Sequence, residues 1–112
     1  MTQVQWLKDG RLMRLMEDVI YLDRNLKEWK APKGAVVDGA SIPRFFWRII
    51  GSPFVGKYRR ASAIHDYYCA TKTEPHKEVH QMFYECMLSD GVGKTKAKMM
   101  YWAVRCCGPR WN

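Results

Sequence analysis

The feature that most constrains this chain is a change in the spacing of its apolar residues near residue 38. Before that point, short runs of β-branched, aliphatic and aromatic residues alternate with turn signals such as Asp9-Gly10 and Pro32-Lys33-Gly34. After it, apolar residues recur every three or four positions, which is the spacing of one face of a helix. The sequence therefore predicts an α+β fold, with a small N-terminal antiparallel sheet followed by three to four helices.

The N-terminal part is predicted to hold strands over residues 4–7, within 11–22, over 26–29 and over 35–37. The run at 11–22 mixes the two spacings, so a helix over 11–18 is an alternative to a strand. Its second half, Val19-Ile20-Tyr21, favours a strand because β-branched and aromatic residues suit a pleated surface.

Four helical segments are predicted after residue 38. A short one covers 44–50 and a longer one 57–71. A third begins near Pro75 and ends before Gly91, and the last runs from 94 to about 107. In the last helix Met99, Trp102 and Cys106 lie apart from the main apolar stripe, so we expect neighbours to cover it on two sides.

The length of 112 residues predicts one domain, with a β-rich part at 1–38 and a helical part at 39–112. No apolar run reaches the length of a membrane span, and the first residues carry no secretory signal. We therefore expect a cytoplasmic protein. The four cysteines show no metal-type spacing and are expected to be small buried residues.

The net charge of +8 is concentrated in two blocks without acids, at residues 43–65 and 94–112. The segment between them carries five acids against two bases. Such blocks attract anionic lipid, acidic proteins or nucleic acid. Contacts to an anionic surface are predicted for the bases of the first block, which are Arg44, Arg48, Lys57, Arg59 and Arg60.

Three places could carry chemistry. The loop at Asp38-Gly39 is either an ordinary turn or part of an oxygen-rich cation site. His65-Asp66 lies in mid-helix, where a buried Asp needs a cation or hydrogen-bond donors. His76 and His80 share one helix face, as a zinc pair or as boundary histidines, and would face the His65 helix if the two helices pack antiparallel.

Several motifs together resemble a phage and prophage family catalogued as domain of unknown function 1353. They are Asp38-Gly39-Ala40-Ser41-Ile42-Pro43, Gly51-Ser52-Pro53-Phe54, Lys57-Tyr58-Arg59-Arg60-Ala61, His65-Asp66-Tyr67-Tyr68, Phe83-Tyr84-Glu85-Cys86-Met87 and Met100-Tyr101-Trp102-Ala103-Val104-Arg105. The resemblance covers most of the chain. It implies a phage or prophage origin and no particular activity.

The motif order also resembles the small bacterial phospholipases A2, and so implies their helical pair. That resemblance implies His65 as the general base, Asp66 and Asp38 as Ca²⁺ ligands, and a carbonyl from the Gly39 region. The position of the orienting Asp is taken by His80, so His80 would join His65 in the catalytic pair. Alternatively His65, Asp66 and His80, with Asp38 or His76, would bind Zn²⁺.

Three functions follow as expectations. The leading one is a non-enzymatic virion or tail component, or a factor that binds a host protein, with Trp6, Trp47 or Trp111 as anchors. The alternative is a Ca²⁺- or Zn²⁺-dependent hydrolase of lipid or other esters that uses His65. The third is nucleic-acid binding, which rests on charge and aromatic content alone.

Overall fold

The fold is the predicted α+β arrangement of antiparallel strands followed by helices. A computed structural model describes residues 4–6, 13–37 and 56–107. The strands are β1 (Val4–Trp6), β2 (Met13–Leu15), β3 (Val19–Leu22), β4 (Glu28–Ala31) and β5 (Val36–Val37). They are followed by a 3-10 turn, η1 (Gly56–Tyr58), and by α2 (Arg59–Thr71), α3 (His76–Ser89) and α4 (Lys94–Cys107).

Within the described residues, the strands form two antiparallel ladders rather than one sheet. The first has the order β1-β2-β5, and the second is the β3–β4 hairpin. Val19 and Tyr21 point into the core while Ile20 and Leu22 point outward, which is the alternation of a half-buried strand. Because β2 occupies residues 13–15, the alternative helix over 11–18 is wrong for the residues described, and the strand predicted at 26–29 begins two residues later.

The hairpin turn is organised by the Asp23 side chain. Its Oδ1 accepts hydrogen bonds from the backbone amides of Asn25 and Lys27, at 2.8 and 3.0 Å. These Asx-type bonds add to the backbone bonds of the same turn, from Leu26 to the Asp23 carbonyl and from Asp23 to the Lys27 carbonyl. Leu26 completes the turn in the left-handed region, at φ 62°.

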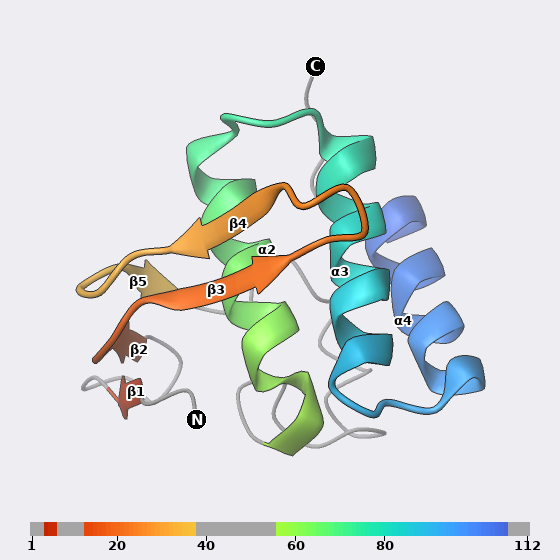
Figure 1. The fold of residues 1–112 in the computed structure, drawn as a ribbon, viewed down its shortest axis with the longest axis horizontal. Coiled ribbons are helices and arrows are strands. Elements are labelled where there is room, and N and C mark those ends of the chain that lie inside the picture. The colour runs from red at the N-terminus through yellow and green to blue at the C-terminus, as the bar shows by residue number, and fades with distance from the viewer. Residues whose placement is uncertain (1–3, 7–12, 38–55, 108–112) are drawn as a thin grey trace.

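Helix α2 is the centre of the molecule because it contacts β3, β4, β5 and α3. Figure 1 shows the β3–β4 hairpin crossing α2, and the three helices standing side by side in alternating directions. Ala61 and Ala63 are fully buried, and their small side chains allow the neighbouring elements to approach closely. No helix in the described ranges is long and apolar enough to cross a membrane.

Helices α2 and α3 each end in a residue whose backbone amide caps the last turn. Helix α2 ends at Thr71, and the amide of the capping residue Lys72 donates to the Tyr68 carbonyl. Helix α3 ends at Ser89 and is capped by Asp90, and Gly91 then adopts φ 91°, a conformation that favours glycine. The predicted boundaries of these helices are confirmed to within a residue or two, while the helix predicted over 44–50 lies outside the described residues.

Candidate functional site

Two candidate histidines meet in the core. His65 lies in the middle of α2 and His80 lies in the first half of α3, which runs antiparallel to it. The His65 Nε2 and His80 Nδ1 atoms are 2.9 Å apart, which is hydrogen-bond distance. The side chains are 0% and 1% exposed. The prediction that His80 faces the His65 helix is therefore confirmed.

The buried position controls the charge of His65. Burial, and after it the nearby His80, lowers the pKa of His65 well below its usual value of 6.5. His65 is therefore a neutral imidazole at pH 7. If its Nε2–H donates to His80 Nδ1, the lone pair remains on Nδ1, which is the form that can accept a proton.

Cys69 lies one turn beyond His65 but is not placed as a nucleophile. Its Sγ is 3.8 Å from both ring nitrogens of His65. A sulfur on the lone-pair axis of one nitrogen would be closer to that nitrogen than to the other, so this thiol lies off both axes. Cys69 and Cys86 are buried and not in disulfides, as predicted, and burial raises the pKa of the Cys86 thiol to about 12.

The remaining candidate ligands are only partly gathered. Asp66 is buried next to His65, and the His76 ring is 5.8 Å from the His80 ring. Asp38 lies outside the described residues. Within the described part of the chain, no three side chains of His, Cys, Asp or Glu converge in a way that would hold a metal ion.

The structure describes three of the five predicted anionic-surface contacts. Arg44 and Arg48 lie outside the described residues, Lys57 is exposed and Arg59 is half-buried. Arg60 binds Asp90 through two hydrogen bonds of 3.1 and 2.7 Å.

Arg60 also donates to the Ile20 carbonyl and lies 5.2 Å from the centre of the Tyr21 ring. Its guanidinium thus fastens α2 to β3 and to the end of α3. That bonding leaves Arg60 less able to meet an external anion.

A surface that the prediction missed lies on α4. Trp102 is 54% exposed, so the expectation that α4 is covered on two sides is wrong at this residue. Lys94, Lys98 and Arg105 are exposed on the same side of the helix, because spacings of three and four residues share one face. We call Lys94, Lys98, Tyr101, Trp102 and Arg105 the α4 surface.

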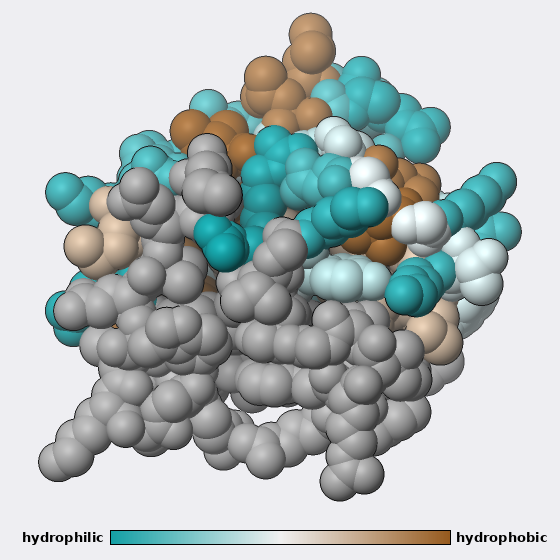
Figure 2. Space-filling view, turned by 90° about the horizontal axis from the view of Figure 1, so that it is seen from below, coloured by the Kyte–Doolittle hydropathy of each residue, from teal (hydrophilic) through white to brown (hydrophobic). Residues whose placement is uncertain are grey.

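The aromatic end of the α4 surface is ordered. Arg105 Nη1 donates to the Tyr101 hydroxyl at 2.7 Å. The Arg105 guanidinium lies 5.6 Å from the Trp102 ring centre and 5.9 Å from the Tyr101 ring centre. Figure 2 views the molecule from the opposite end of α4, where the loop from α3 to α4 lies, and hydrophilic and hydrophobic side chains both appear on the described surface there.

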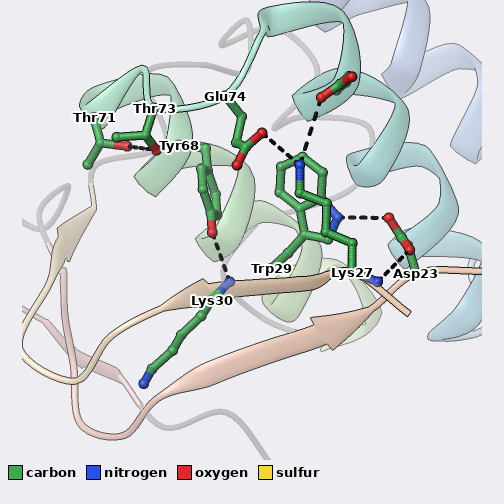
Figure 3. A network of polar contacts seen from close by, with 9 residues as sticks. Asp23, Lys27, Trp29, Lys30, Tyr68, Thr71, Thr73 and Glu74 are labelled. Atoms are coloured by element: carbon green, nitrogen blue, oxygen red, sulfur yellow. Dashed lines mark hydrogen bonds and ion pairs between the residues drawn. The ribbon is translucent and has the colours of Figure 1, made fainter. Parts of the chain in front are cut away.

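A groove of about 320 Å³ lies between the β3–β4 turn and α3, with Trp29 and Met82 among its lining residues. Lys27 donates to Glu74 at 2.6 Å and lies over the Trp29 ring, and the Trp29 indole donates to Asp23 at 3.1 Å. Figure 3 shows these contacts. The hydrogen bond to Glu74 raises the pKa of Lys27, and the one from Trp29 lowers the pKa of Asp23. These groups bond to one another, and the bond from Lys27 to Glu74 holds the hairpin turn against the segment that precedes α3.

The sequence contained a signal for the α4 surface. Residues 94–107 hold four bases and no acid, and Lys94, Lys98, Trp102 and Arg105 already share one face by spacing. What the spacing does not reveal is whether another element covers that face.

Comparison with known proteins places the chain in a family. Residues 13–104 match the family model described as "Protein of unknown function (DUF1353)". The chain is 50% identical over 101 residues to "Uncharacterized protein y4jT" and 43% identical over 98 residues to "Uncharacterized protein y4iH", both of Sinorhizobium fredii (strain NBRC 101917 / NGR234). These matches cover 90% and 88% of this chain but only 30% and 41% of the relatives. No solved structure matches the chain. The chain therefore belongs to the DUF1353 family of proteins of unknown function.

Proposed function

We propose that the protein is a non-enzymatic binding protein, either a virion or tail component or a factor that interacts with the host. The observation that carries this proposal is the exposed Trp102 on the basic α4 surface. A large side chain gains about 2 kcal/mol from full burial, and a half-exposed indole forgoes part of that gain. A binding partner that covers Trp102 would supply the missing part of this gain.

The α4 surface has the composition of a binding site. Tyr, Trp and Arg are the residues that most often anchor interfaces. The bond from Arg105 to Tyr101 and the stacking of Arg105 near Trp102 hold the three side chains together before any partner arrives. Such preorganisation lowers the entropy lost on binding. By contrast, His65 and His80 are closed off from solvent and cannot meet a partner without rearrangement.

Site-specific photo-cross-linking tests the proposal. A benzophenone amino acid is placed at Lys98 on the α4 surface or, as the control, at Leu26, which is 80% exposed at the hairpin turn. After irradiation of cells that make the protein, we expect an adduct at position 98 that is lost with Lys94→Glu. An equal adduct at position 26, or none at 98, contradicts the proposal. The mass of the adduct identifies its chemical class.

A second candidate function, an ester hydrolase, is favoured by the 2.9 Å contact between His65 and His80. Burying two imidazoles costs more desolvation than burying apolar side chains, and buried polar groups of this kind concentrate at functional sites. This mechanism requires the core to open so that water and the ester reach His65. His65 Nδ1 then takes a proton from water while the water oxygen bonds to the ester carbonyl carbon. The tetrahedral intermediate then expels the alcohol oxygen, which takes the proton from His65. His80 would act as a positioning residue.

Turnover of a short-chain ester and of phosphatidylcholine tests this second candidate, with Ca²⁺, Zn²⁺ or a chelator in separate arms. Loss of a general base should slow turnover by a factor of about 100 or more in His65→Gln. The exposed Lys77→Gln serves as the control and should keep full activity. Equal turnover in wild type and His65→Gln, or none in any arm, removes the hydrolase.

A further inference from the structure

We propose that the partner of the α4 surface is an anionic lipid bilayer. This inference rests on the proposed binding function and names the class of its partner. Its first support is charge: α4 carries Lys94, Lys96, Lys98 and Arg105 and no acid in 14 residues. A uniformly negative plane complements such a helix, because each Lys or Arg near it contributes to binding.

The second support is the shape of the charged row. Lys94, Lys98 and Arg105 lie on one side of a single helix. The row is about 16 Å long, since each helical residue rises about 1.5 Å. In Figure 1, α4 stands at the outer edge of the helical layer, on the side of α3 away from α2. A straight row on an outer helix can meet a plane along its whole length.

The third support is the placement of the aromatic residues at one end of this row. Trp and Tyr favour the membrane interface, where one part of the ring is apolar and the other is wet. Arg105 lies beside Trp102, and the Tyr101 ring meets the Trp102 ring at 72°. These neighbours limit the ring area on which a nucleic-acid base would stack, whereas lipid needs no free ring face. The geometry therefore favours lipid over nucleic acid.

The lysines are placed where they weaken the helix. Lys94, Lys96 and Lys98 lie in the first five residues of α4, at the positive end of its dipole, and that first turn holds no acid. Replacing them by Gln should therefore leave the helix as stable as before or more so. Loss of binding in such variants reports on the surface rather than on unfolding.

Co-sedimentation with vesicles tests the inference. The probes are vesicles of phosphatidylcholine with phosphatidylglycerol, and vesicles of phosphatidylcholine alone. Wild type should bind only the anionic vesicles, and added salt should release it. Each lysine is expected to contribute about fivefold to the partition coefficient, so Lys94→Gln/Lys98→Gln should weaken binding about 25-fold. Trp102→Ala should weaken it further.

The matched control is Lys33→Gln/Lys77→Gln, which removes the same charge from exposed positions away from α4. It should retain binding within about twofold, since distant charges are screened. Equal losses in the two double variants, or no binding to anionic vesicles, overturn the lipid inference. If the α4 lysines instead bind a single-stranded oligonucleotide, the inference fails while the proposed function stands. If no adduct forms at position 98 either, the proposed function fails with it.

Discussion

The buried His65 should make the protein lose stability in mild acid. Burial and the neighbouring His80 lower the pKa of His65 in the folded chain. In the unfolded chain its pKa returns to about 6.5. Below that pH the unfolded state binds more protons than the folded state, so the free energy of unfolding falls as the pH falls.

The magnitude follows from this difference in bound protons. At pH 7 the unfolded His65 is mostly neutral, and at pH 5 it is almost fully protonated. If the folded His65 stays neutral throughout, the free energy of unfolding decreases by about 2 kcal/mol between pH 7 and pH 5 from this group alone. That is a large share of the stability of a small domain, which is about 5–15 kcal/mol.

Urea unfolding followed by circular dichroism at a series of pH values measures this loss. His65→Gln keeps an amide donor near His80 but cannot take up the proton, so its stability should depend less on pH by about 2 kcal/mol over the same window. Gln81→Ala changes an exposed residue of α3 that does not titrate, leaves the 2.9 Å contact intact and should keep the slope of wild type. Parallel slopes for wild type and His65→Gln would refute the buried neutral pair.

Three further substitutions test the packing. Arg60→Met removes the guanidinium that binds the partly buried Asp90 and should lower the free energy of unfolding in urea by about 1–3 kcal/mol. A change smaller than the error of the measurement would show that the pair does not stabilise the fold. Trp29→Phe keeps a buried ring but removes the donor to Asp23. It should cost about 1 kcal/mol and raise the pKa of Asp23, which a carboxyl ¹³C titration measures. In Gly91→Ala the added Cβ would meet only Lys57 carbons at 3.9 Å, so the space around it allows the substitution. The positive φ should still lower the free energy of unfolding by about 1 kcal/mol, and an unchanged melting temperature would contradict this.

The helices were predictable because their start and stop signals are local. Pro75 precedes the first residue of α3, and Gly91 follows its end at a positive φ. The separation of the strands into two ladders was not predictable. Whether β3 joins β2 or pairs only with β4 depends on how α2 packs against β3, β4 and β5, and the strand sequences do not encode that contact.

The contact between His65 and His80 was predictable from the sequence, and the exposure of Trp102 was not. Helical projection places His80 toward α2, and antiparallel packing of two helices joined by a short loop brings it to His65. Projection also places Trp102 off the main apolar stripe of α4. It predicts that this residue has a different environment, but it cannot tell a second covering element from solvent. The structure shows solvent.

The cross-linking yield at position 98 in two variant backgrounds tests the central claim most directly, that the protein acts through the α4 surface. Trp102→Ala removes the exposed anchor, and His65→Gln alters the buried pair and leaves α4 intact. The account predicts that the adduct is lost with Trp102→Ala and retained with His65→Gln, with both proteins folded by circular dichroism. Retention with Trp102→Ala and loss with His65→Gln would contradict it.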